Sequence, residues 1–111
     1  MNDCAKEKHY GAAVKTARDY YNSEDADNFY ALVWGGEDIH VGLYEQPQED
    51  IYTASVRTNA VMAEQVPRLG ADTRVIDLGS GYGGALRYLA REYGCSGIGF
   101  NVSERENERG R

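Results

Sequence analysis

The chain has 111 residues, enough for one domain with a modest core but short for a complete doubly wound sheet. Its 18 acidic residues outnumber its 12 lysines and arginines, and the net charge of −6 disfavours nucleic acid and anionic membranes as partners. No apolar run approaches the roughly 18 residues of a membrane span, and no signal peptide is evident, so we expect a cytoplasmic protein. The two cysteines, Cys4 and Cys95, predict neither a metal site nor a disulfide framework, and Cys95 is expected to be a small buried residue.

The first half of the chain is predicted to be helical. Apolar residues at helical spacing predict a helix over residues 10–21, followed by a polar break at 22–27. A short helix over 28–33 is expected to end at a glycine pair, and an ordered loop over 35–49 follows. A longer helix is predicted over 49–65. Its expected apolar face comprises Ile51, Ala54, Thr58, Val61 and Met62.

The second half alternates strands and helices. A buried strand is predicted over residues 74–78 and a second strand over 96–101, with a helix over 83–93 between them. Another helix is expected to begin at Ser103 as N-cap, with Glu106 at the capping-box position. This order predicts an α/β fold in which a right-handed crossover joins two parallel strands.

The turn after the first strand carries the clearest functional signal. Gly79-Ser80-Gly81-Tyr82-Gly83-Gly84 matches the pattern G-x-G-x-x-G, in which glycines let bare backbone approach a nucleotide-type cofactor. Asp77, two positions earlier, would repel a pyrophosphate but suits a ligand with ammonium and sulfonium groups. Asn101 ends the second strand, where a dinucleotide site normally has an acid. The loop therefore favours S-adenosyl-L-methionine over a dinucleotide, with a purely structural glycine turn as the third interpretation.

Asp77 to Gly84 resembles motif I of class I methyltransferases that depend on S-adenosyl-methionine. The upstream segment Phe29 to Tyr44, together with Tyr20-Tyr21, resembles the N-terminal segment of sarcosine/dimethylglycine N-methyltransferases, the enzymes of stepwise glycine-betaine synthesis. The segment 99–107 resembles their second-strand motif. More remotely, the chain is similar to tocopherol and cyclopropane-fatty-acid methyltransferases.

This resemblance implies a Rossmann-like class I methyltransferase fold in one apparently truncated domain. Residues 1–48 would form a helical and loop cap, and residues 49–111 the first β-α-β-α portion of the cofactor-binding core. The resemblance also implies a set of cofactor-binding residues. They are Tyr21, Trp34, Ile39, His40, Asp77, Gly79, Ser80, Gly81, Asn101, Val102 and Glu106.

Each side chain in this set also has a structural interpretation. Tyr21 and Trp34 are equally compatible with core packing, and His40 with a structural histidine. Asp77 could serve only to orient the loop, and Glu106 only to cap a helix.

The implied reaction is transfer of a methyl group from S-adenosyl-methionine to a small amine such as sarcosine or dimethylglycine. We assign no catalytic residue, because a neutral amine needs no strong base. The alternatives are a C-methyltransferase of the tocopherol or cyclopropane-fatty-acid type and an inactive truncated remnant. Family members are longer, and a two-stranded sheet with bare edges favours association, so we also expect homo-oligomers.

Overall fold

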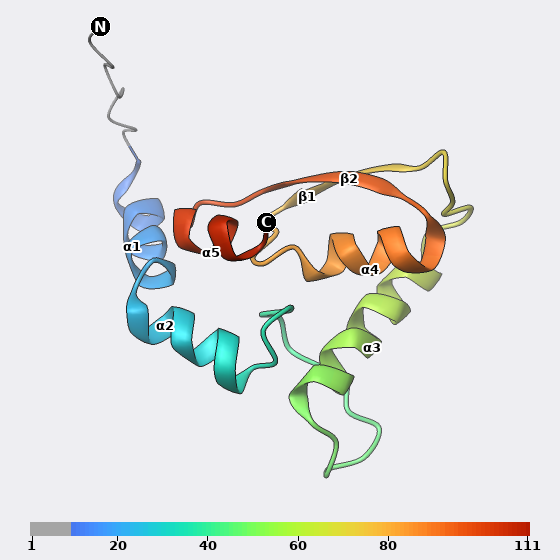
Figure 1. The fold of residues 1–111 in the computed structure, drawn as a ribbon, viewed down its shortest axis with the longest axis horizontal. Helices are drawn as coiled ribbons and strands as arrows, with labels where there is room; N and C mark the ends of the chain where they lie inside the picture. Colours follow the sequence, from blue (N-terminus) through green and yellow to red (C-terminus); the bar gives the residue numbers. More distant parts are fainter. Residues whose placement is uncertain (1–9) are drawn as a thin grey trace, which may run out of the picture.

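The computed structural model describes residues 10–111 (Figure 1). Cys4 and the N-terminal segment examined for a signal peptide lie outside these residues. Within them, no helix has the length and apolar character needed to cross a membrane. The elements in chain order are α1 (Ala12–Tyr21), α2 (Glu24–Asn28), the π-helix η1 (Phe29–Val33), α3 (Ile51–Glu64), β1 (Arg74–Leu78), α4 (Gly84–Tyr93), β2 (Ser96–Phe100) and α5 (Glu104–Arg109).

The predicted β-α-β unit is confirmed. Strands β1 and β2 pair in parallel, with Ile76 opposite Ile98, and α4 crosses between them along one face of the sheet (Figure 1). Strand β2 presents Gly97 and Gly99 toward α4, where an added Cβ would lie 2.7 Å from Leu86 Cδ2 and 2.5 Å from Ser80 Oγ. The missing side chains therefore let α4 and the glycine loop lie close to the sheet.

The prediction that residues 74–78 form a buried strand is wrong for one face of the sheet. Ile76 and Leu78 are 67% and 80% exposed, and their partners Ile98 and Phe100 are about half exposed. These four side chains point away from α4, because alternate residues of a strand face opposite sides. Figure 1 shows no element covering that side. Cys95, which precedes β2, is buried as predicted.

The N-terminal helices differ from the predicted pattern. The expected polar break contains α2, whose N-cap Ser23 accepts a hydrogen bond from the Ala26 amide at 3.2 Å. Acidic residues in its first turn interact favourably with the positive end of the helix dipole. The predicted short helix is the π-helix η1, which continues directly from α2 and ends before Gly35 and Gly36, both with positive φ.

The predicted apolar face of α3 is confirmed for Ala54 and wrong for Val61 and Met62. The buried residues are Ala54, Ser55, Asn59 and Ala63, whereas Val61 and Met62 are exposed. Asn59 is buried because its amide donates a hydrogen bond to the buried Asp38 carboxylate at 3.1 Å. The buried side of α3 therefore includes a polar residue that is paired with the preceding loop.

Helix α1 buries none of its residues and is attached to α5 by polar contacts. The Arg18 guanidinium and the Asn22 amide both donate to the Glu104 carboxylate, each with a bond of 2.9 Å. The Ser103 hydroxyl donates to Asn22 Oδ1 at 2.6 Å. The N-terminal cap therefore lies beside the end of β2, as Figure 1 shows.

Candidate functional site

The glycine loop borders a cavity of about 530 Å³. The loop between η1 and α3, one face of α3, and the segment after β2 form its other walls. Most residues predicted to bind a cofactor line it together, although they come from separate parts of the chain. They are Tyr21, Ile39, His40, Asp77, Gly79, Ser80, Asn101, Val102 and Glu106.

The glycine loop has the backbone that its sequence predicts. The φ values of Gly79, Gly81 and Gly83 are 83°, 53° and 79°. Residues other than glycine rarely adopt these values. The amides of Gly79 and Ser80 donate to the Phe100 carbonyl oxygen at 2.7 and 3.1 Å. These bonds fix the loop against the end of β2.

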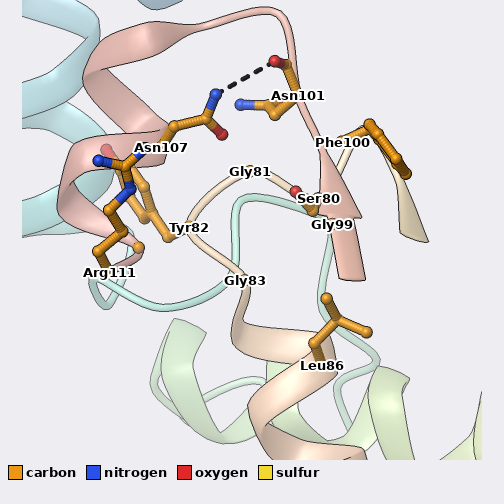
Figure 2. A pocket seen from close by; sticks show the side chains of 11 residues that line it. Ser80, Gly81, Tyr82, Gly83, Leu86, Gly99, Phe100, Asn101, Asn107 and Arg111 are labelled. Carbon is orange, nitrogen blue, oxygen red and sulfur yellow. Dashed lines mark hydrogen bonds between the residues drawn. The ribbon is translucent and has the colours of Figure 1, made fainter. Parts of the chain in front are cut away.

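Gly81 lines a second cavity, of about 350 Å³, on the other side of the loop. Figure 2 shows the loop residues Ser80, Gly81 and Gly83 on one side of it and Asn107 and Arg111 on the other. The Asn107 amide donates to the Asn101 carbonyl oxygen at 3.2 Å, which joins α5 to the end of β2 (Figure 2).

Asn101 and Glu106 form a polar pair at one end of the larger cavity. Asn101 Nδ2 donates to Glu106 Oε2 at 2.5 Å, while the buried Oε1 has no hydrogen-bond partner among the described residues. Burial raises the pKa of the Glu106 carboxyl. Ser103 caps α5 as predicted, by accepting a bond from the Glu106 amide at 3.2 Å. The Glu106 side chain faces Asn101, so its role goes beyond that of a capping-box residue.

His40 is fixed from two sides. Its Nε2 donates to the Ser55 carbonyl oxygen at 3.0 Å, since a carbonyl oxygen only accepts. Trp34 does not line the larger cavity, but its Nε1 donates to the His40 carbonyl oxygen at 3.0 Å. The structure therefore places Trp34 behind His40, as a support for the segment that carries it.

Tyr21 reaches the cavity from the end of α1. Its ring centroid lies 5.0 Å from that of Tyr20 and 6.2 Å from that of Tyr30. It is therefore both a cavity-lining residue and a member of an aromatic cluster, which combines the two interpretations that its sequence position allows.

The cavity is also lined by residues that were not predicted to bind a cofactor. They are Glu37, Asp38, Thr58, Asn59, Met62 and Ala85. Asp38 stands out, because its side chain is 5% exposed and its environment depends on residues distant in sequence. Asn59, a polar residue next to the apolar run Ala60 to Ala63 of α3, was the available signal for a buried partner.

The charged side chains that line the cavity are all acidic among the described residues: Glu37, Asp38, Asp77 and Glu106. A wall of carboxylates favours a cationic ligand, and the free Glu106 Oε1 is suited to accept a bond from a hydroxyl or amine. The arrangement therefore fits a ligand that combines hydroxyl groups with positive charge.

Comparison with known proteins supports the resemblance found in the sequence. No family model matches the chain. Over 102 residues, 92% of the chain, it is 66% identical to a glycine/sarcosine/dimethylglycine N-methyltransferase of Actinopolyspora halophila. Over 99 residues, 89% of the chain, it is 60% identical to a sarcosine/dimethylglycine N-methyltransferase of Halorhodospira halochloris. The chain spans 18% and 36% of the length of these two relatives.

A solved structure gives the same result for the fold. It comes from Galdieria sulphuraria and is assigned as a sarcosine dimethylglycine methyltransferase. It matches with a TM-score of 0.69 and 44% identity, over 78% of this chain and 35% of that one. The predicted fold class, the first portion of a class I methyltransferase, is thereby confirmed.

Proposed function

We propose that this chain forms the S-adenosyl-methionine-binding part of an N-methyltransferase that acts on a small amine such as sarcosine or dimethylglycine. The observation that carries the proposal is the larger cavity. It unites the glycine loop, the polar pair Asn101–Glu106 and the segment with Ile39 and His40, and its charged residues are acidic. The relatives named above support the same class of reaction.

The residues fit this cofactor. When bound, S-adenosyl-methionine supplies an electrophilic methyl group on a sulfonium. The carboxylate of Glu106 and the amide of Asn101 would bind ribose hydroxyls, and bare backbone at Gly79 would lie against the amino-acid part. Asp77 would face a positive group of the ligand. We propose that the protein aligns the amine with the methyl group and excludes water.

The calorimetric test uses S-adenosyl-homocysteine, which is stable and lacks only the transferred methyl group. Saturable binding to the purified protein supports the proposal, and no binding at millimolar ligand points instead to a non-catalytic remnant. The control variant Glu24→Gln should bind S-adenosyl-homocysteine like the unmodified protein, because Glu24 lies on α2 and does not line the cavity.

The acceptor is tested separately, by analysing products with glycine, sarcosine and dimethylglycine in turn. A methylated amine supports the proposed substrate class. Methylation of a lipid-like acceptor and of none of these amines would contradict it and favour an acceptor of the C-methyltransferase type.

The proposal treats residues 1–48 as a cap and 49–111 as the start of the core. In this proposal, the polar contacts of α1 and α2 with α5 attach the cap to the core. The bare sheet face supports association of copies.

A further inference from the structure

Asp38 occupies an unusual position between two helices. Its Oδ2 accepts a hydrogen bond from Asn59 of α3 at 3.1 Å, and both residues are buried. An added Cβ at Gly84, the first residue of α4, would lie 2.6 Å from the Glu37 carbonyl oxygen and would also clash with Asp38 Oδ1. The absence of a side chain at Gly84 thus allows a carboxylate to lie against the start of α4.

The second carboxylate oxygen of Asp38 has no donor. Among residues 10–111, no side chain or amide forms a hydrogen bond with Oδ1, and its nearest ring nitrogen is His40 Nδ1 at 4.0 Å. That distance is too long for a direct hydrogen bond. Because His40 Nε2 donates to Ser55, Nδ1 of the neutral ring carries a lone pair. Two acceptors therefore lie side by side at the cavity wall without a donor between them.

This spacing suits a group that carries at least two hydrogen-bond donors. A nitrogen about 2.8 Å from each acceptor can bond to both atoms, and an ammonium group has enough N–H donors to do so. A hydroxyl has only one hydrogen and cannot donate to both. Asp38 also favours a cation, since burial raises the pKa of its carboxyl and a nearby positive charge would relieve that cost.

We propose that Asp38 Oδ1 and His40 Nδ1 together bind the α-ammonium group of the amino-acid part of the cofactor. This inference rests on the proposed function. In this arrangement Asn101 and Glu106, which line the same cavity, would bind the nucleoside. Asn59 is a positioning residue, because it holds the Asp38 carboxylate through Oδ2.

The experiment compares two variants and two ligands by calorimetry. Asp38→Asn has the same shape, and its oxygen can still accept the bond from Asn59, but it then presents an NH₂ group to the ammonium. Asp19→Asn is the matched control, because it makes the same change at an exposed carboxylate of α1 that does not line the cavity. The ligands are S-adenosyl-homocysteine and 5′-methylthioadenosine, which lacks the amino-acid part.

We expect Asp38→Asn to weaken S-adenosyl-homocysteine at least about tenfold and to leave methylthioadenosine within about twofold. Asp19→Asn should change neither by more than about threefold. Unchanged binding of S-adenosyl-homocysteine to Asp38→Asn overturns the inference, as does an equal loss of both ligands. If the unmodified protein binds neither nucleoside, the proposed function fails and the inference fails with it.

A second measurement needs no variant and covers the case in which Asp38→Asn does not fold. The deamino analogue of S-adenosyl-homocysteine keeps the carboxylate and lacks only the ammonium group. The unmodified protein should bind it at least about tenfold more weakly than S-adenosyl-homocysteine. Equal affinity would show that no ammonium site contributes.

Discussion

The guanidinium of Arg109 donates two hydrogen bonds to the carboxylate of Asp27, at 2.9 and 2.6 Å. Asp27 belongs to α2 and Arg109 to α5, and the hydroxyl of Tyr82 in the glycine loop donates to the same carboxylate at 3.2 Å. One buried carboxylate therefore connects the N-terminal cap, the loop that borders the cavity and the last helix.

Replacing Arg109 should destabilise the protein. Arg109→Met leaves Asp27 buried without its cation, and the side chain of Arg109 is itself 42% exposed, so we expect a loss of about 1–2 kcal/mol in the free energy of unfolding. Arg91→Met is the control, since Arg91 pairs with the exposed Glu92 at the surface. Urea denaturation measures the free energy of unfolding of both variants. Equal losses would mean that the Asp27–Arg109 pair stabilises the protein no more than the surface pair of Arg91 does.

Acid should weaken the attachment of α1 to α5. Hydrogen bonds from Arg18 and then Asn22 lower the pKa of Glu104 to about 2, from a usual value of 4.5. A carboxyl whose pKa is depressed by folding stabilises the protein above pH 4.5, and this contribution is lost as the pH falls toward 2. The stability difference between the unmodified protein and Glu104→Gln should therefore shrink over that range. A constant difference in urea midpoints from pH 6 to 2.5 would contradict the assignment.

Glu106 should behave in the opposite sense. Burial raises the pKa of its carboxyl, so the folded state favours the protonated form and loses stability as the pH rises through that raised value. Glu106→Gln removes the buried charge, and we expect it to be more stable by about 1 kcal/mol at pH 7. The advantage should vanish in acid. Thermal unfolding of both proteins at pH 7 and pH 4 checks this. If Glu106→Gln is less stable at both pH values, interactions within the folded protein offset the cost of burying the Glu106 charge.

The sequence predicts the local features of the fold well. The glycine loop, the cap at Ser103 and the two parallel strands each depend on residues close together in the chain. The resemblance also placed most of the residues that line the larger cavity.

Features that depend on distant residues were not predicted. The segment containing Asp27 was predicted as a polar break because its residues are polar. The burial of Asp27 depends on its pairing with Arg109, which lies far along the chain. The buried face of α3 was misplaced because a polar residue such as Asn59 is expected to be exposed, and its partner Asp38 lies on another segment. Periodicity arguments cannot detect a polar side chain whose hydrogen-bond partner lies on another element.

The bare sheet face should drive association of a polypeptide of residues 1–111. Its exposed apolar side chains are Ile76, Leu78, Ile98 and Phe100. Apolar surface on this scale favours burial against another copy. We expect a concentration-dependent sedimentation coefficient that the double variant Leu78→Ser/Phe100→Ser shifts toward the monomer. A monomer with a sharp unfolding transition independent of concentration would rule this out.

Gly84→Ala should damage both the fold and the cavity, although alanine is intrinsically favoured over glycine in a helix by about 1 kcal/mol. The added Cβ would meet the Glu37 carbonyl oxygen at 2.6 Å and the Asp38 carboxylate, so the segment before Ile39 must move. We expect a loss of about 1–3 kcal/mol in stability and at least tenfold weaker binding of S-adenosyl-homocysteine. Gly70→Ala is the control, because nothing lies within 4 Å of its added Cβ. If Gly84→Ala unfolds and binds like the Gly70 variant, the Asp38 carboxylate does not lie against the start of α4 in solution.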